Sequence, residues 1–121
     1  APHFLLKESG EAPLSLQKTL RGRIVQKDGR LRVALPPASL PHAVEQALQK
    51  GRVKRILVIG QGTAAVAGQA VAGALTDALS RTSIAVQATP ATELSGFGMR
   101  DEMSDTLIVA ISQSGTTTDT N

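Results

Sequence analysis

The chain has 121 residues, a net charge of +3, 41% hydrophobic residues, 2% aromatic residues and no cysteine. The lack of cysteine excludes disulfides, cysteine-ligated zinc and a thiol nucleophile. No apolar run is long enough to cross a bilayer and the N-terminus lacks the layout of a signal peptide, so the sequence predicts one soluble, cytoplasmic domain with an aliphatic core.

The charge is unevenly distributed. Residues 1–55 carry a formal charge of +7 and residues 56–121 carry −4. A basic half can indicate a nucleic-acid partner. Here the basic residues are spread out, and Phe4 and Phe97 are the only aromatic side chains that could stack on bases. The pattern favours a solvated basic face, so we expect neither nucleic acid nor a membrane as a partner.

The chain opens with short predicted elements. Three leucines follow Pro13, which suits a first helical turn, and this pattern predicts a helix over residues 12–21. An Asp28-Gly29 turn between two short runs then predicts a small hairpin within residues 23–34.

A second helix is predicted over residues 40–48, where apolar residues recur at helical spacing. Ser39 is its expected N-cap and Gly51 lies just past its expected end. These elements make residues 1–54 a helical lead-in segment.

From residue 55 the pattern alternates strands and helices. The predicted elements are strand 56–59, helix 63–80, strand 83–88, a short helix from Thr89-Pro90 to about Leu94, and strand 106–111. Continuous apolar runs indicate buried parallel strands. The alternation predicts an α/β fold, a three-layer, doubly wound parallel sheet with right-handed crossovers. Three strands are few for such a sheet, so we expect the domain to be truncated at Asn121.

The helix over residues 63–80 is rich in alanine and glycine. Its buried stripe is predicted to comprise Val66, Ala70, Val71, Ala74, Leu75, Ala78 and Leu79. The small residues let the helix lie close to a sheet, at some cost in intrinsic helix stability.

The loop after the first strand, residues 60–65, reads Gly-Gln-Gly-Thr-Ala-Ala and matches a dinucleotide fingerprint of the form Gly-x-Gly-x-x-Ala. Such a site also needs an acidic residue at the end of the second strand, for the ribose hydroxyls. That strand offers Gln87, and no acid lies between Arg81 and Thr92. Two interpretations stay open, an NAD or FAD site and a plain close-packing turn.

The loop after the last strand, residues 112–120, carries hydroxyls on six of its nine residues. Hydroxyls and backbone N–H groups at a helix N-terminus form a phosphate site. The loop has no Lys or Arg, so it is unsuited to phosphoryl transfer and suits instead a metabolite phosphate held as a handle. The alternative is a Ser/Thr N-cap without a ligand.

These residues resemble a known family. Residues 111–120 resemble the Ser-Gln-Ser-Gly-(Glu/Thr)-Thr-x-Asp-Thr signature of SIS (sugar isomerase) domains, and residues 56–63 and 91–94 resemble the family's preceding segments. The resemblance implies a flavodoxin-like SIS domain.

The lead-in is also similar to part of one SIS-containing family. Pro2–Glu8, Glu11–Pro13 and Arg21–Ile24 look like the segment with which isomerising glutamine–fructose-6-phosphate aminotransferases enter their isomerase region. This implies that residues 1–54 are the lead-in and residues 55–121 the first part of an SIS domain.

The resemblance implies fructose-6-phosphate or glucosamine-6-phosphate as the ligand, no cofactor, no metal, and a homodimer. The implied substrate-binding residues are Gly62, Thr63, Ser112, Gln113, Ser114, Gly115 and Thr117. Two positions depart from the family pattern, since Ala64 stands where Ser is usual and Thr116 where Glu is common. The lost hydroxyl at Ala64 bears on which sugar is chosen rather than on the phosphate site.

Four side chains offer acid–base chemistry: His3, His42, Glu93 and Asp119. None is a convincing general base, because the histidines fall in the lead-in and the acids suit capping roles, so we expect no catalytic residue in this chain. The resemblance places the catalytic Glu, His and Schiff-base Lys after this segment and a glutaminase cysteine before it.

The implied parent is an aminotransferase of amino-sugar biosynthesis. It would convert fructose-6-phosphate and glutamine to glucosamine-6-phosphate and glutamate, with the rest of the isomerase and a glutaminase domain as partners of this segment. The fragment alone is expected to be inactive. A second interpretation is a sugar-phosphate-sensing SIS module of a transcriptional regulator, and a dinucleotide-binding domain is the third.

Overall fold

The computed structural model describes residues 3–116 and 118–120. The chain forms two compact units, Ala1–Pro41 and His42–Asn121. No described residue of the first unit is buried, whereas the second unit contains an aliphatic core. Within the described part of the chain, no helix is both long and apolar enough to cross a membrane.

The first unit begins with helix α1, Phe4–Leu20. The helix predicted over residues 12–21 therefore starts too late, and Pro13 lies inside the helix rather than in its first turn. A proline removes one backbone N–H donor, but here the helix continues on both sides of it. The turn before the proline carries an i,i+4 ion pair, with Lys7 Nζ 3.8 Å from Glu11 Oε1.

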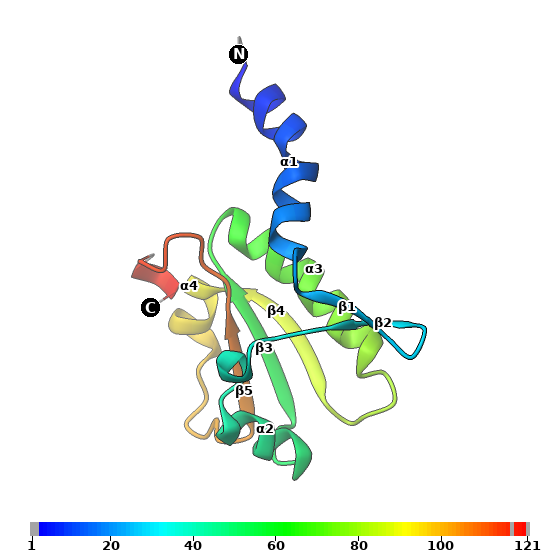
Figure 1. Cartoon of the computed structure of the whole chain (residues 1–121). Coiled ribbons are helices and arrows are strands. Elements are labelled where there is room, and N and C mark those ends of the chain that lie inside the picture. The colour runs from blue at the N-terminus through cyan, green and yellow to red at the C-terminus, as the bar shows by residue number, and fades with distance from the viewer. Residues whose placement is uncertain (1–2, 117, 121) are drawn as a thin grey trace. The chain divides into compact units, whose positions relative to one another are not determined.

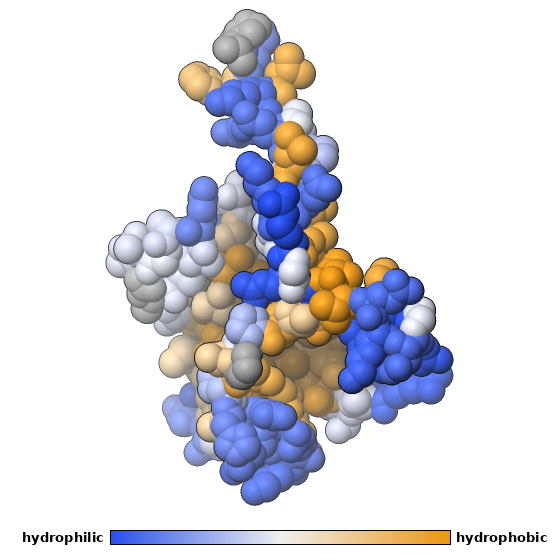
Figure 2. Space-filling model, viewed as in Figure 1, coloured by the Kyte–Doolittle hydropathy of each residue, from blue (hydrophilic) through white to orange (hydrophobic). Residues whose placement is uncertain are grey.

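The predicted hairpin is confirmed. Strands β1 (Ile24–Lys27) and β2 (Arg30–Val33) are antiparallel, and Asp28 and Gly29 between them have φ values of 53° and 72°. Positive φ at both central positions gives a type I′ turn, whose twist matches that of the strands. The hairpin tip is hydrophilic, whereas hydrophobic side chains lie along parts of α1 (Figure 2).

The second unit begins with helix α2, His42–Gln49. The predicted N-cap is wrong, because Ser39 ends a separate 3₁₀ turn, η1 (Pro37–Ser39). Leu40, which follows this turn, is extended, with φ −123° and ψ 113°. Extended backbone is what the proline after Leu40 favours, so the helix begins only beyond that proline.

The predicted end of this helix is confirmed. Gly51 has φ 63°, and its N–H donates to the Leu48 carbonyl oxygen at 3.0 Å. The Arg52 N–H donates to the Ala47 carbonyl oxygen at 2.9 Å. These two bonds form a Schellman motif, which needs the left-handed conformation that glycine adopts readily.

Three parallel strands form the sheet of the second unit (Figure 1). They are β3 (Arg55–Gly60), β4 (Ala85–Pro90) and β5 (Thr106–Ala110), in the order β4-β3-β5. The strands predicted at 56–59 and 106–111 are confirmed. Strand β4 begins two residues later than predicted, because the Thr82 hydroxyl accepts a 3.3 Å bond from the Ile84 N–H and a turn occupies that place.

Helices cover both faces of this sheet. They are α3 (Thr63–Ala78) on one face, and α4 (Ala91–Glu93) with the π-type turn η2 (Leu94–Gly98) on the other. Ile56 and Val58 of β3 pack towards α3 and α2, while Leu57 and Ile59 pack towards α4. The predicted α/β class, with helices on both sides of a parallel sheet, is therefore confirmed. The order β4-β3-β5 corresponds to the first three strands of a flavodoxin-like sheet.

The face of α3 that meets the sheet differs from the predicted stripe. Gly68 and Ala72 are buried, and Leu75 and Leu79 are half-buried. The two leucines were predicted correctly, but Val66 is 65% exposed and the other predicted members are also exposed. A Cβ on Gly68 would lie 3.5 Å from a β3 side chain, so helix and strand are already in contact. Small residues mark the buried face because only they allow this approach.

Candidate functional site

The loops after β3 and β5 begin side by side (Figure 1). Ile59 pairs with Ala110 in the sheet, and the Ile111 N–H donates to the Ile59 carbonyl oxygen at 2.8 Å. The chain passes from β3 through α3 to β4 on one side, whereas β5 lies on the other side of β3. The strand order therefore reverses between β3 and β5, and ligands of doubly wound sheets bind at the carboxyl ends of strands at such a point.

The first loop presents the N-terminus of α3. Gly60 lies where the end of β3 meets the first turn of the helix, and a Cβ there would come 2.7 Å from the Ala64 carbonyl carbon. Gly62 is the N-cap, with φ 59°, and Thr63 is the first helical residue. Both are exposed, so the sequence presents a hydroxyl at a helix end where N–H groups and the helix dipole favour an anion.

The second loop is held by its own hydroxyls. The Gly115 N–H donates to Ser112 Oγ at 3.0 Å, and the Thr116 N–H donates to Ser114 Oγ at 3.2 Å. The Thr116 hydroxyl also lies 3.0 Å from Ser114 Oγ. Gly115 has φ 71°, which the turn requires. A serine hydroxyl that accepts a bond keeps its own proton for donation, so both serines can still bind an oxyanion.

The structure places six of the seven predicted substrate-binding residues on these two loops. They are Gly62, Thr63, Ser112, Gln113, Ser114 and Gly115. Ser112 is half-buried and the other five are exposed. The seventh, Thr117, lies outside the described residues. The role of all seven in binding stays a prediction.

Two further polar atoms on these segments are buried and have no partner among the described residues. They are Oε1 of Gln61, in the first loop, and Oγ1 of Thr120, in the 3₁₀ turn η3 (Thr118–Thr120). A buried polar atom without a hydrogen bond costs about 1–3 kcal/mol, so each suits a ligand that supplies the missing bond. Sequence reasoning did not select either residue. Gln61 could have been selected from the sequence, because it is a polar residue between two glycines at the end of a predicted strand.

One ion pair of the second unit lies near the amino end of β5. Arg100 Nη2 is 2.8 Å from Asp105 Oδ1. A hydrogen bond from the Thr106 hydroxyl, helped by Arg100, holds the pKa of Asp105 below its ordinary value. Hydrogen bonds donated by Ser104 likewise lower the pKa of Glu102. The two loops contain no Lys or Arg, so the candidate site consists of neutral donors.

The four acid–base candidates come from four different segments of the chain. His3 precedes α1 in the first unit, and His42 begins α2, with its Nδ1 3.7 Å from Glu45 Oε2. Glu93 ends α4, and α4 contacts the turn η3, which belongs to the second loop. The side chain of Asp119 is outside the described part. Among the described residues, no three His, Asp or Glu side chains are grouped so that they could hold a metal ion.

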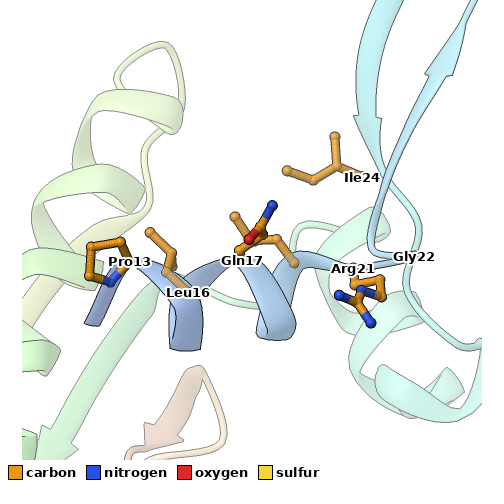
Figure 3. Close-up of a pocket in the computed structure, with 7 residues that line it drawn as sticks. Pro13, Leu16, Gln17, Arg21, Gly22 and Ile24 are labelled. Atoms are coloured by element: carbon orange, nitrogen blue, oxygen red, sulfur yellow. The ribbon is translucent and has the colours of Figure 1, made fainter. Parts of the chain in front are cut away.

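A hollow of about 530 Å³ lies in the first unit, between α1 and the start of β1 (Figure 3). Its lining residues are Pro13, Leu16, Gln17, Leu20, Arg21, Gly22 and Ile24. The lining is mainly apolar, and no residue of the two loops contributes to it. This hollow therefore forms no part of the candidate site.

Comparison with known proteins supports the resemblance to the aminotransferase family as a distant one. The isomerizing glutamine–fructose-6-phosphate aminotransferases of two strains of Thermus thermophilus are each 36% identical to the chain over 121 residues. The match covers 98% of this chain and 17% of each relative. The chain is a distant homologue of a region of these enzymes. No family model matches the chain, and no solved structure matches it significantly.

Proposed function

We propose that the loops after β3 and β5 bind a phosphosugar, fructose-6-phosphate or glucosamine-6-phosphate, as the sugar-phosphate-binding part of an SIS isomerase domain. The observation that carries the proposal is the position of the hydroxyl-rich segment 112–116 beside the N-terminus of α3, where the strand order reverses. The distant homology supports the choice of sugar, because the relatives' name contains fructose-6-phosphate.

Each side chain has a role that its chemistry allows. The Ser112 and Ser114 hydroxyls donate to phosphate oxygens, and each such bond to a charged group contributes about 1.5–3 kcal/mol. Thr63 reaches the sugar from the start of α3. The Gln61 amide oxygen, buried and unpartnered among the described residues, accepts a hydrogen bond from a sugar hydroxyl. Neutral donors hold the phosphate without neutralising it, which suits a ligand that must leave again.

In the parent enzyme these residues would form one side of the substrate site. We propose that residues 1–54 are its lead-in and residues 55–121 the first part of its SIS domain. The parent, a homodimer, would make glucosamine-6-phosphate from fructose-6-phosphate and glutamine, with the catalytic groups and a glutaminase domain supplied by other segments. The 121-residue chain alone should therefore bind ligand without turnover.

Binding is tested by titrating the ¹⁵N-labelled chain with fructose-6-phosphate and recording amide chemical shifts. We expect saturable shifts at the residues around Thr63 and Ser114, and much weaker shifts with fructose, which lacks the phosphate. NADH tests the dinucleotide interpretation of the first loop in the same assay. Shifts with NADH and none with fructose-6-phosphate would overturn the phosphosugar assignment.

Hydroxyl deletions test the proposed contacts. Ser114→Ala and Ser112→Ala should each weaken binding at least about tenfold, the effect of losing one bond to a charged group. Ser80→Ala, an exposed serine after α3, serves as the matched control and should leave the affinity unchanged. Equal affinities for all three variants and the parent sequence would refute the role given to the second loop.

A further inference from the structure

A second hollow, of about 160 Å³, lies on the α4 side of the sheet. Its lining residues are Arg55 and Leu57 of β3, Gln87 and Thr89 of β4, and Leu94 and Gly98 of η2. Alternate residues of a strand point to the same face, and Leu57 pairs with Gln87 in the sheet. None of the residues proposed to bind the phosphosugar lines this hollow.

Three polar side chains converge here above an apolar floor. Arg55 and Thr89 are half-buried and Gln87 is exposed, and within the described residues none of these side chains forms a hydrogen bond or an ion pair. The floor is formed by Leu57 and Leu94, which are 3% and 6% exposed.

The Arg55 guanidinium is open to a ligand because its natural counter-ion is already engaged. It attracts Asp105 and contributes to the lowered pKa of that carboxyl, but Arg100 makes the 2.8 Å ion pair with Asp105. On β4, Arg55 faces Ala85, whose small side chain leaves space beside the guanidinium.

We propose that this hollow binds a small monocarboxylate with a short aliphatic body. A guanidinium presents two parallel N–H donors that match the two oxygens of a carboxylate. One cation accompanied only by a neutral amide and a hydroxyl suits a single negative charge. The size also fits, because an apolar cavity of about 150 Å³ accommodates benzene, which has six heavy atoms. The aliphatic body lies on Leu57 and Leu94. This site does not depend on the proposed phosphosugar site.

Butyrate is the probe, and butyramide is its neutral isostere. We expect saturable amide shifts at the lining residues when the ¹⁵N-labelled 121-residue chain is titrated with butyrate, and binding of butyramide at least about tenfold weaker because the charge-assisted bonds are lost. Absence of saturable shifts with butyrate, or equal binding of butyramide, would overturn the proposal.

Variants separate the guanidinium from general charge effects. Arg55→Gln should abolish butyrate binding. Arg55→Lys should weaken it, since Lys keeps the positive charge but lacks the two parallel N–H donors of a guanidinium. Arg81→Gln, an exposed arginine that does not line the hollow, is the matched control and should bind butyrate normally. If an Arg55 variant fails to fold, Thr89→Val, which replaces the hydroxyl by a methyl group of similar size, should still weaken binding. Unchanged butyrate affinity in folded Arg55→Gln would refute the site.

Discussion

Gly60 is the residue at which the central strand comes closest to the helix that follows it. A Cβ on this glycine would lie 2.7 Å from the carbonyl carbon and oxygen of Ala64 and 2.9 Å from the Ala65 nitrogen. These are backbone atoms of the first turn of α3, so they cannot swing away as a side chain would. Gly60→Ala should therefore lower the free energy of unfolding by about 1–3 kcal/mol, the usual cost of overpacking. Urea denaturation followed by circular dichroism measures it.

Gly73 supplies the matched control for this prediction. It lies in the middle of the same helix, and a Cβ there would meet nothing within 4 Å. Gly73→Ala should leave the fold intact and raise its stability by about 0.5–1 kcal/mol, because alanine loses less backbone entropy in a helix. If Gly60→Ala proves as stable as Gly73→Ala, the strand and the helix are not as close as described.

Asp105 makes the stability of the second unit depend on pH. Its pKa is lowered in the folded state, chiefly by the Thr106 hydroxyl and also by Arg100, so the ionised carboxylate stabilises the fold. This contribution is complete above the ordinary carboxyl pKa and is lost as the pH falls through the lower folded pKa. Asp105→Asn should therefore reduce the urea midpoint near pH 7, and reduce it by less at about pH 3, which is below the ordinary carboxyl pKa. An equal reduction at both pH values would show that the charge is not involved.

At the scale of elements, the sequence predicts a strand, helix or turn best where the hydrophobic or turn pattern matches the packing of that element in the fold. The apolar run at residues 56–59 forms the central strand, which is buried on both faces. The Asp28-Gly29 pair adopts the positive φ values of a hairpin turn, so a local signal predicted the hairpin. Helix α3 shows the opposite case, because Gly68 and Ala72 form its buried face while Val66 points outward. Close packing selects small residues, which carry little hydrophobic signal, so a search for apolar periodicity selects the wrong stripe.

The position of the candidate site could be predicted from the sequence, but its internal hydrogen bonds and burial could not. A strand end and a hydroxyl-rich composition sufficed to select the loop over residues 112–120, and the strand order places the start of this loop beside the loop that contains Gly62 and Thr63. The choice of individual binding residues came from the family resemblance and stays a prediction. The internal bond from the Gly115 N–H to Ser112 Oγ was not predictable, since it depends on the loop conformation. The burial of the Gln61 amide oxygen depends on packing around the loop, and sequence pattern contains no such information.

At the scale of the whole chain, the buried hydrophobic side chains of the described residues all lie between Val53 and Leu94. Val53 belongs to the cluster on the α3 face, against which Ala47 and Leu48 of α2 also pack. Helix α2 therefore contributes to the core of the second unit, His42–Asn121. The division into a lead-in of residues 1–54 and an SIS part from residue 55 stays a prediction that truncation can test.

Two truncated chains, residues 42–121 and residues 55–121, should differ in stability. The longer one keeps all of the buried side chains described above, so we expect it to unfold cooperatively. The shorter one loses Val53 and the α2 residues packed beside it, and should be less stable by at least about 2 kcal/mol, the value of one fully buried aliphatic side chain. The chain has no tryptophan or tyrosine, so urea unfolding is best followed by far-ultraviolet circular dichroism. Equal stability of the two chains would instead support a domain boundary after residue 54.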